Sequence, residues 1–381
     1  MKLHCDIQLP ASKSESNRAL MIAAYGGFEL DLQNLSGSTD TLCLANALRE
    51  IQQKKNVIDI VDCGTAARFL TTYLACHEGE WILTGSERMK QRPIKHLVEV
   101  LLFLSVDIQY VEEEGYLPLR IHGKPIAGGN VQVEMQQSSQ FASSLLLAAP
   151  MWTQGLEMEL LGELSSLPYL EMTLAMMRHF GAEIDRNDRT IVVKPKPYQS
   201  NGFTIEPDWS AASYWYEMAA FSKECEIRLR SLSLSKSRSC LQGDSIIAEW
   251  MKPLGVGTFC EGDDIVLRKI PRDYRPLRFD FYAHPDLYPT MAATCAGLGV
   301  DAEFLGLDNL HLKESDRVEA MQAELAKLGQ RPLRFCAHND HRIVMALAPL
   351  SMKFGTVIFD HPEVVEKSYP RFWQDFGNIS G

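Results

Sequence analysis

Long apolar runs are missing from this sequence. No stretch of about 18 consecutive apolar residues, the length that a transmembrane helix needs, occurs among its 381 residues. Residues 1–10 alternate as in a β-strand, without a basic region followed by an apolar one, so we expect no secretory signal peptide. We therefore expect neither a membrane span nor export.

Closely spaced cysteines are missing as well. The nine cysteines lie far apart and form no CxxC pair. This spacing argues against a disulfide framework and against a zinc cluster. We expect reduced thiols in a cytoplasmic protein.

Basic residues are outnumbered, with 38 Lys and Arg against 49 Asp and Glu and a formal net charge of −11. Binding to a phosphate backbone needs a broad basic surface, so nucleic acid is not expected to be the main partner. The hydrophobic content of 46% and the charged content of 23% are typical of a soluble globular protein.

One short pattern recurs six times along the chain. Each copy is a polar segment of small residues, often with a cation, followed by about three turns of mostly Ala, Leu and Met. The copies begin at residues 12–18, 62–68, 137–140, 208–214, 286–290 and 339–342. Equivalent points at residues 14, 65, 139, 211, 290 and 341 are separated by 51, 74, 72, 79 and 51 residues. Such regular intervals indicate an internal repeat of helix starts.

A second, amphipathic helix is predicted after each of these. Its copies are expected at residues 41–51, 93–104, 169–180, 245–254, 317–328 and 369–376. Pairs of short strands around acidic turns follow at 106–114, 183–188 and 258–264 and are read as hairpins. The repeat is therefore a β-α-β-α-β-β unit, present six times, and the two intervals of 51 residues leave little room for a hairpin at 52–61 and 329–337.

Six units suggest two domains of three, because 381 residues are too many for one core. Residues 1–12 resemble a strand that pairs with the C-terminal units. We therefore predict an α/β fold with one domain at residues 13–206 and the other at 1–12 plus 207–381. The chain would then cross between the domains twice, at a hinge.

Cations lie at or just before the predicted helix starts. They are Lys13, Arg18, Arg68, Arg88, Lys90, Arg92, Lys313, Arg317, Arg342 and Lys367. Helix starts attract anions, but a cation in the first turn opposes the helix dipole, so we expect a bound anion to compensate these cations. Ser14, Thr65 and Ser139 alone would be ordinary N-caps. With the cations, the pattern predicts a site for a small ligand that carries phosphate and carboxylate groups.

Eight motifs, in order and across the whole chain, closely resemble those of the 5-enolpyruvylshikimate-3-phosphate synthase family. They are ASKSESNRALMIAA, CGTAARF, GSERMKQRPIKHL, SSQFASSLLLAAP, SSLPYLEMTL, LKESDR, NDHRIVMALA and EKSYPRF. The resemblance implies two domains, each an inside-out α/β barrel of three units. It also implies transfer of the enolpyruvyl group of phosphoenolpyruvate to the 5-hydroxyl of shikimate 3-phosphate, in chorismate and aromatic amino-acid biosynthesis. No metal or organic cofactor, a monomer, and inhibition by glyphosate are further expectations.

The resemblance also assigns site residues. Those implied for shikimate 3-phosphate are Lys13, Ser14, Arg18, Ser138, Ser139, Gln140, Ser166, Tyr169, Asp286, Asn309 and Lys313. Those implied for phosphoenolpyruvate are Lys13, Gly64, Arg92, Gln140, Arg317, Arg342 and Lys367, with Arg68 and His341 in support. Arginine forks fit carboxylates and phosphates, and a glycine at position 64 would let phosphate approach the backbone.

Three residues are implied in catalysis: Lys13, Asp286 and Glu314. By resemblance, Asp286 helps to deprotonate the attacking hydroxyl. Glu314 protonates and later deprotonates the methylene carbon around a tetrahedral intermediate, and Lys313 could set its protonation state. Without the resemblance, Glu314 would be an ordinary acidic residue at a helix start.

Some residues depart from the family's motifs, and competing hypotheses stand beside this interpretation. Asp62 stands where the family often has Asn, and Leu167 where Lys is frequent. UDP-N-acetylglucosamine enolpyruvyl transferase is one competing hypothesis, but such enzymes usually carry a Cys in the loop that corresponds to residues 85–93, which has none here. A non-catalytic anion-binding paralogue is a second hypothesis, and a metal site at His338 and His341 is a third.

Overall fold

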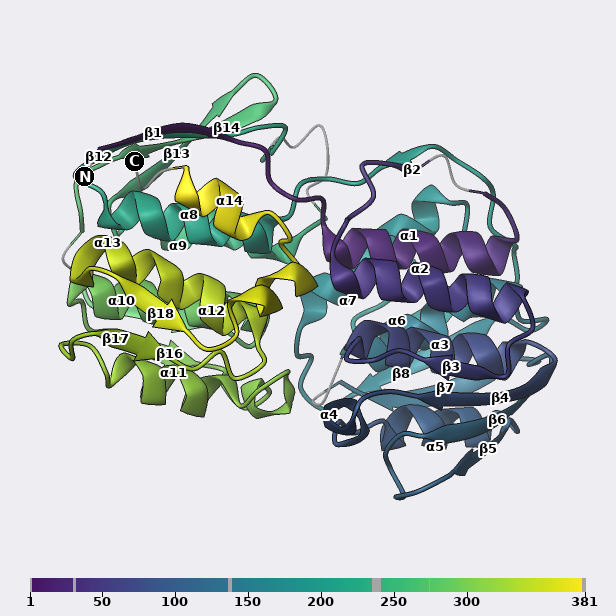
Figure 1. Cartoon of the computed structure of the whole chain (residues 1–381). Helices are drawn as coiled ribbons and strands as arrows, with labels where there is room; N and C mark the ends of the chain where they lie inside the picture. The colour runs from purple at the N-terminus through teal and green to yellow at the C-terminus, as the bar shows by residue number, and fades with distance from the viewer. Residues whose placement is uncertain (1, 30–31, 136–138, 235–240, 274, 379–381) are drawn as a thin grey trace. The chain divides into compact units, whose positions relative to one another are not determined.

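The computed structural model describes residues 2–29, 32–135, 139–234, 241–273 and 275–378 (Figure 1). The chain forms two compact units. Unit 1 is Met1–Ser12, Gly37–Thr39 and Glu206–Gly381, and unit 2 is Lys13–Ser36 and Asp40–Ile205. Glu206 groups with unit 1, where its carbonyl accepts a 2.8 Å hydrogen bond from the N–H of Ser12. Thr39 groups there too, since its Oγ1 donates to the Glu366 carbonyl at 3.1 Å.

Unit 2 contains three repeats. The first is α1 (Lys13–Gly26), β2 (Leu32–Gln33) and α2 (Thr39–Gln52), with β11 (Phe203–Thr204) parallel to β2. The second is β3 (Val57–Asp59), α3 (Gly64–Cys76), β4 (Gly79–Thr84), α4 (Glu87–Lys90), α5 (Lys95–Phe103), β5 (Asp107–Tyr110) and β6 (Leu119–Gly123), in the sheet order β3-β4-β6-β5. The third is β7 (Gly129–Glu134), α6 (Ser139–Ala148), β8 (Leu156–Leu161), α7 (Leu167–His179), β9 (Ile184–Arg186) and β10 (Thr190–Val193), in the order β7-β8-β10-β9.

Unit 1 repeats the same scheme. Its first repeat is β1 (Lys2–Ile7), α8 (Trp209–Phe221), β12 (Glu224–Leu229), α9 (Ile247–Trp250), β13 (Val256–Glu261) and β14 (Asp264–Lys269), in the order β1-β12-β14-β13. The second is β15 (Leu277–Asp280), α10 (Tyr288–Leu298), β16 (Ala302–Leu305) and α11 (Arg317–Leu325). The third is β17 (Leu333–Phe335), α12 (His341–Leu347), α13 (Ser351–Phe354), β18 (Val357–Phe359) and α14 (Phe372–Gly377).

The six predicted helix starts are confirmed at α1, α3, α6, α8, α10 and α12. The three predicted hairpins are confirmed as the antiparallel pairs β5–β6, β9–β10 and β13–β14. The expectation of six complete units is wrong for the last repeat, which has only the parallel pair β17 and β18 among the described residues. The helix predicted at 245–254 is also shorter. Only Ile247–Trp250 is α-helical, since Pro253 has no N–H to continue the helix and disfavours the α conformation before it.

A strand from a distant part of the chain completes the first repeat of each unit. The N-terminal β1 runs parallel to β12, with Lys2 opposite Glu224 and Ile7 opposite Leu229, so the predicted pairing of the N-terminal segment with the C-terminal repeats is confirmed. In unit 2, Phe203 of β11 lies opposite Leu32 of β2. In both cases the strand comes from the segment just before the chain passes into the other unit.

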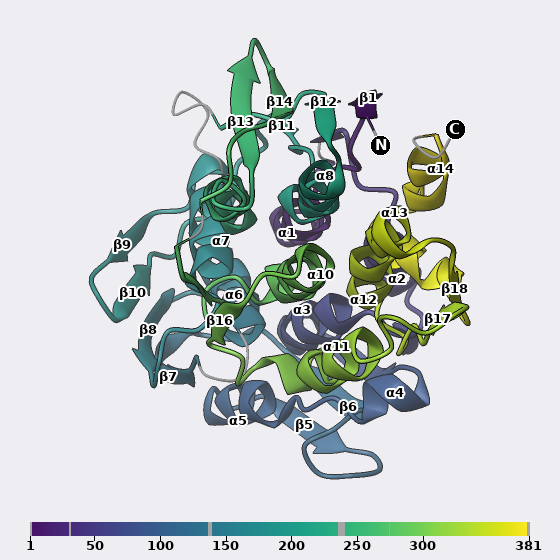
Figure 2. The ribbon, with the colours of Figure 1, turned by 90° about the vertical axis from the view of Figure 1, so that its left-hand side faces the viewer.

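The first helix of each repeat lies in the interior, with the sheets outside (Figure 2). Small residues allow these helices to pack closely, and hydroxyl groups link them. Thr72 of α3 and Ser144 of α6 are joined at 2.6 Å, and Ser213 of α8 and Thr290 of α10 at 3.0 Å. Because the interior helices carry the motif residues at their starts, the fold holds those residues on rigid elements. Of the helices described, none is both long and apolar enough to cross a bilayer.

Candidate functional site

Lys13 begins α1 and forms an ion pair with Asp40 at the start of α2. Nζ of Lys13 lies 3.0 Å from Oδ2 of Asp40, and the two side chains are only 12% and 6% exposed. The backbone carbonyl of Asp40 also accepts a hydrogen bond from Sγ of Cys63, which caps α3. Asp40 therefore brings the starts of α1, α2 and α3 together, although the sequence interpretation assigned it no role.

Arg18 is held in place by three neighbours. Its Nε donates to Oγ1 of Thr173 at 2.7 Å, and its two terminal nitrogens donate to the carbonyls of Ser14 at 2.9 Å and Tyr169 at 3.1 Å. Burial lowers the pKa of the Arg18 guanidinium to about 10. The side chain thus joins the predicted residues Ser14 and Tyr169, which lie on different helices, and its orientation is fixed before any ligand arrives.

Gly64 begins α3 between two arginines. Its carbonyl accepts a hydrogen bond from Nη1 of Arg68 at 3.0 Å, while Nη2 of Arg68 donates to the Pro93 carbonyl at 3.2 Å. A Cβ at position 64 would lie 2.5 Å from Nη1 of Arg92. The sequence interpretation attributed this glycine to close approach of a phosphate. In the structure, the close approach is already made by Arg92.

The remaining predicted residues of unit 2 lie at the starts of α6 and α7. Ser139 is the first residue of α6 and is buried, and Nε2 of Gln140 donates to Oγ1 of Thr65 at 3.3 Å, which links α6 to α3. Ser166 precedes α7 with φ of 53° and is 7% exposed. Ser138 lies outside the described residues.

Arg317, at the start of α11, is the centre of the predicted residues of unit 1. Its side chain is 1% exposed and contacts three carboxylates. Nη1 lies 2.8 Å from Oδ1 of Asp286, Nη2 lies 2.9 Å from Oε2 of Glu314, and Nε lies 2.8 Å from Oδ2 of Asp340. Both predicted catalytic carboxylates of this unit therefore bind the same guanidinium.

Asp286 also binds Arg342. Oδ2 of Asp286 accepts from Nη2 of Arg342 at 2.6 Å, and the carboxylate is 19% exposed. Burial by itself would raise the pKa of Asp286, but Arg342, Arg317 and Lys313 outweigh it and hold that pKa well below its usual value. Asp286 is therefore ionised at neutral pH, and its negative charge is shared between two arginines.

Asp340 is a member of this cluster that the sequence interpretation missed. It is fully buried, caps α12 by accepting from the N–H of Arg342 at 3.0 Å, and accepts from Ser315 at 3.2 Å as well as from Arg317. Nδ1 of the buried His341 lies 3.6 Å from its Oδ1. The signal in the sequence was an aspartate directly before a predicted helix, which is a common N-cap.

Three further predicted residues of unit 1 lie on segments next to the cluster around Arg317. Asn309 is nearly buried and precedes the 3-10 helix Leu310–Leu312, and Lys313 follows that helix. Lys367 ends the 3-10 helix Pro362–Lys367, which packs against α12. Asn309 and Lys313 thus lie just before the loop that carries Glu314, and Lys367 lies on an element next to the helix of His341 and Arg342.

Protein groups compensate the cations at these helix starts, which corrects the expectation that a bound anion is required. Lys13 is paired with Asp40, Arg18 and Arg68 donate to backbone carbonyls, and Arg317 binds three carboxylates. The carboxylates offset the helix dipole as well as the cation, because acidic groups near an N-terminus are favourable. A ligand anion that binds these cations would therefore have to replace protein carboxylates, because the cations are already paired.

Comparison with known proteins decides the family. A family model described as EPSP synthase (3-phosphoshikimate 1-carboxyvinyltransferase) matches residues 51–376. The chain belongs to the EPSP synthase family. A 3-phosphoshikimate 1-carboxyvinyltransferase of Bacteroides fragilis (strain YCH46) is 42% identical, covering 98% of this chain and 95% of the relative. One of Pasteurella multocida is 32% identical, covering 97% and 94%.

Solved structures agree on the fold. An EPSP synthase from Acinetobacter baumannii superposes with a TM-score of 0.73 at 19% identity, covering 99% of this chain and 96% of that one. The enolpyruvyl transferase NikO from Streptomyces tendae gives a TM-score of 0.74 at 14% identity, covering 99% and 95%. The predicted resemblance and two-domain α/β fold are confirmed.

The positions at which this EPSP synthase family member departs from the expected motifs have local roles. Oδ1 of Asp62 accepts a hydrogen bond from Oγ of Ser86, which ties the segment before α3 to α4. Leu167 is the first residue of α7 and is half-buried. Both departures therefore lie at or just before the start of a helix whose neighbouring residues carry the expected motif.

The hypothesis of a metal site has no support in the described part of the chain. Nε2 of His338 is 2.9 Å from Oε1 of Glu324, whereas His341 lies beside Asp340. No group of three or more His, Cys, Asp or Glu residues with a metal-binding arrangement occurs among the described residues.

Asp244 is a third acidic residue, after Asp40 and Asp340, that the sequence interpretation missed. It is 3% exposed, accepts a hydrogen bond from Ser210 and lies 3.9 Å from Nδ1 of His284. Burial, together with the charge of Asp286, raises the pKa of Asp244. Ionisation of this carboxyl is therefore disfavoured.

Proposed function

We infer that the chain transfers the enolpyruvyl group of phosphoenolpyruvate to the 5-hydroxyl of shikimate 3-phosphate and releases phosphate, a step of chorismate and aromatic amino-acid biosynthesis. Family membership supports this reaction, as do relatives named 3-phosphoshikimate 1-carboxyvinyltransferase. The observation that carries it is the binding of Asp286 and Glu314 to the single guanidinium of Arg317. These ion pairs support the proposal, because they bring two candidate proton-transfer groups next to the candidate binding group for the anionic donor.

Asp286 is proposed to take the proton of the attacking hydroxyl. In the structure its pKa is too low for an effective base, because Arg342 and Arg317 stabilise the carboxylate. When the carboxylate or phosphate of phosphoenolpyruvate binds these two arginines, part of their field is neutralised and the pKa of Asp286 rises. The base thus becomes effective only with the donor in place.

Glu314 is proposed to act on the donor carbon. As the hydroxyl oxygen bonds to C2 of the enolpyruvyl group, Glu314 gives a proton to C3, and the tetrahedral intermediate forms. The C2–O bond to phosphate then breaks while Glu314, which began the cycle as the acid, takes a proton back from the new methyl group, and the proton that Asp286 took leaves with the phosphate. The proton that Glu314 gives is therefore recovered within the cycle.

Unit 2 is proposed to supply most ligands of shikimate 3-phosphate. Lys13, Ser14, Arg18, Ser138, Ser139, Gln140, Ser166 and Tyr169 would come from unit 2, and Asp286, Asn309 and Lys313 from unit 1. For phosphoenolpyruvate we propose Lys13, Gly64, Arg92 and Gln140 together with Arg317, Arg342 and Lys367, supported by Arg68 and His341. The fixed orientation of Arg18 supports its role, since a preorganised fork loses little entropy on binding.

The reaction is tested by phosphate release from the purified protein mixed with phosphoenolpyruvate and shikimate 3-phosphate. The matched control replaces the acceptor with UDP-N-acetylglucosamine. We expect release only with shikimate 3-phosphate. Release with the nucleotide sugar alone would establish the competing transferase, and release with neither would favour a non-catalytic anion-binding protein.

The domains at 13–206 and 1–12 plus 207–381 are proposed to close around the two substrates, as a monomer. Each half of the site is carried by one unit, so a ligand that binds both halves would draw them together. Solution scattering should give a smaller radius of gyration with shikimate 3-phosphate and glyphosate than without them. An unchanged radius would contradict closure.

The cytoplasm is the proposed location. No disulfide joins the described cysteines, and reduced thiols are the state that a reducing compartment maintains. Fractionation of the source cells, followed by detection of the chain in the cytosolic and membrane fractions, tests this placement.

A further inference from the structure

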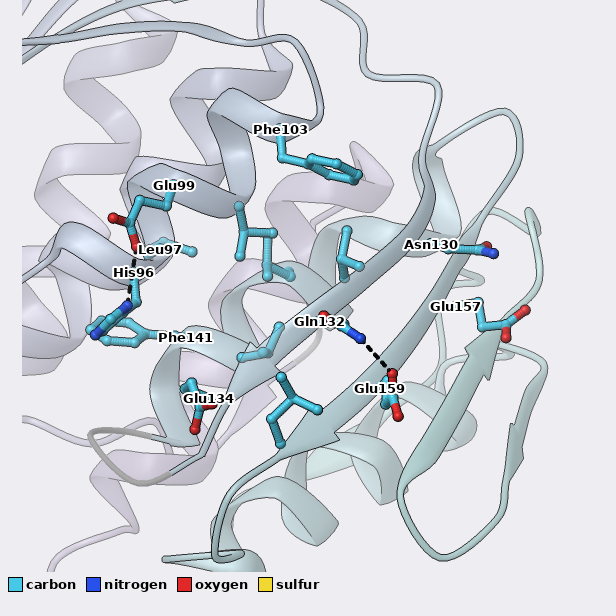
Figure 3. A pocket seen from close by; sticks show the side chains of 15 residues that line it. His96, Leu97, Glu99, Phe103, Asn130, Gln132, Glu134, Phe141, Glu157 and Glu159 are labelled. Atoms are coloured by element: carbon cyan, nitrogen blue, oxygen red, sulfur yellow. Dashed lines mark hydrogen bonds and ion pairs between the residues drawn. The ribbon is translucent and has the colours of Figure 1, made fainter.

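A cavity of about 610 Å³ lies in unit 2 between α5 and the sheet that begins with β7, and Phe141 and Leu145 of α6 also line it (Figure 3). Its volume is within the roughly 300–1,000 Å³ that ligand sites occupy. None of its lining residues belongs to the proposed reaction site. The cavity therefore needs a separate explanation.

The lining shows that the cavity follows the edge of a strand. All five residues from Asn130 to Glu134 of β7 contribute, whereas β8 contributes Glu157, Glu159 and Leu161, which lie at alternate or terminal positions. Successive side chains of a strand point to opposite faces, so a space lined by five consecutive residues must run along the strand edge. In the sheet order β7-β8-β10-β9, β7 is the terminal strand and pairs only with β8 among the described strands.

Three of the five residues that α5 contributes to the cavity are apolar. They are Leu97, Val100 and Phe103, whose side chain is 74% exposed, and the other two are His96 and Glu99. Phe103 is the most exposed large apolar residue of the described chain. An open strand edge beside exposed apolar side chains is the surface on which an additional strand can pair.

The sheet side is acidic. Glu134, Glu157 and Glu159 line it, Glu99 of α5 adds a fourth carboxylate, and no Lys or Arg of the described residues lines the cavity. Two of the four have polar neighbours: His96 contacts Glu99 at 3.1 Å, and Nε2 of Gln132 donates to Glu159 at 2.8 Å (Figure 3). Four carboxyl groups and no Lys or Arg in this lining favour an occupant with positive charge.

We propose that this groove binds an extended polypeptide segment of a partner protein, in which Lys or Arg alternates with apolar residues, as an added strand along β7. On the solvent face, the cations would lie over the carboxylates of β7 and β8. On the other face, the apolar residues would contact Val100 and Phe103. The six residues of β7 accommodate a segment of similar length, about 20 Å at ~3.3 Å per residue.

The test uses the full chain and a defined probe, acetyl-Lys-Val-Lys-Val-Lys-Val-amide labelled with a fluorophore. Fluorescence anisotropy should show saturable one-to-one binding. A peptide with Glu in place of Lys, and one with Gly in place of Val, should not bind. Failure of the Lys-Val peptide to bind would overturn the proposal.

Charge specificity is tested with the double variant Glu157→Lys plus Glu159→Lys. Its matched control, Glu113→Lys plus Asp263→Lys, makes the same change of net charge at two exposed turns outside the groove. We expect about tenfold weaker binding for the first variant and little change for the second. Equal weakening in both would mean general attraction to an acidic protein and would overturn the proposal.

Strand pairing is tested with two N-methylated peptides. Methyl groups on the three valines remove the N–H donors of one edge of the extended peptide, and methyl groups on the three lysines remove those of the other. Pairing with β7 uses only one edge, so one peptide should lose binding and the other should keep it. Equal binding of the two would exclude an added strand.

Phosphate release by the groove variants should equal that of the unmodified protein, which also confirms that they fold.

Discussion

Asp286 and Arg317 form an ion pair at 2.8 Å, and each of them also binds other charged side chains. Asp286 also binds Arg342, and Arg317 also binds Glu314 and Asp340. A group that is proposed to react is thus held by the same arginines that are proposed to bind the donor. Substitutions in this cluster should therefore separate stability, binding and chemistry.

Replacing Asp286 by Asn should lower kcat by about 10²–10⁴, the usual contribution of a general base. The variant should bind phosphoenolpyruvate at least as tightly, because Arg317 and Arg342 lose a competing carboxylate. Isothermal titration and steady-state kinetics measure the two effects. A variant with weaker donor binding and unchanged kcat would show that Asp286 only positions the arginines.

The same substitution should also destabilise the ligand-free protein at pH 7, by about 3–5 kcal/mol, because a buried ion pair loses one partner. The folded-state pKa of Asp286 is below its unfolded value, so its contribution is present above the unfolded pKa and is lost as pH falls. Urea unfolding at pH 7 and pH 3, the latter below the unfolded pKa of an aspartate, should therefore show a smaller difference between the two proteins at pH 3.

Glu314→Gln should also reduce kcat by about 10²–10⁴, with little change in the affinity for shikimate 3-phosphate. Gln keeps the shape and can still accept from Arg317, but it cannot exchange a proton with carbon. A direct readout is incorporation of deuterium from D₂O into the methylene group of unreacted phosphoenolpyruvate, which the variant should abolish. Near-normal kcat with a lower melting temperature would favour a role as a helix-start residue alone.

Gly64→Ala should raise the KM for phosphoenolpyruvate by displacing Arg92, since the new Cβ would lie 2.5 Å from Nη1 of Arg92. A double-mutant cycle with Arg92→Ala decides the mechanism. If the methyl group acts through Arg92, Gly64→Ala should have almost no further effect once Arg92 is absent. Additive effects on KM, or a larger effect on glyphosate inhibition in that background, would mean that the methyl group meets the ligand directly.

The buried carboxyl of Glu217 in α8 should make the free energy of unfolding depend on pH. Its carboxyl is fully buried, neither oxygen has a hydrogen-bond partner among the described residues, and burial raises its pKa well above 4.5. The folded-state pKa exceeds the unfolded one, so stability falls as pH rises between them, by about 1.4 kcal/mol per pH unit. Glu217→Gln should stabilise the protein more at pH 8 than at pH 5 in urea unfolding. The reverse order would contradict a neutral buried carboxyl.

The sequence predicted local features of this fold better than long-range ones. The starts of α1, α3 and α12 follow from small and polar residues ahead of Ala-rich segments, which is a short-range signal. Asp40 and Asp340 were missed because their importance depends on partners elsewhere, 27 residues away for Lys13 and 23 for Arg317. Their spacing carries no periodic pattern, so only the packed helices show that they meet.

The site followed a similar division. The resemblance implied that Arg317 binds phosphoenolpyruvate and that Asp286 helps to deprotonate the attacking hydroxyl. The structure adds that these two side chains bind each other. Gly64 is a similar case. The residue type indicated that space is needed at this position, but only the packing shows that the side chain of Arg92 occupies that space. Residue types thus predict which chemistry is available, and packing determines which groups compete for it.

The pairing of the N-terminal β1 with the distant β12 has a consequence for how the chain folds during synthesis. β1 is made first, but its partner β12 begins only at Glu224, after all of unit 2 has been translated. Unit 2 can close its β2–β11 pair as soon as Thr204 emerges, whereas β1 must wait unpaired on the ribosome until then and beyond. During this interval the N-terminal strand, with its alternation of polar and apolar residues, is therefore open to chaperones and to premature pairing with other nascent chains.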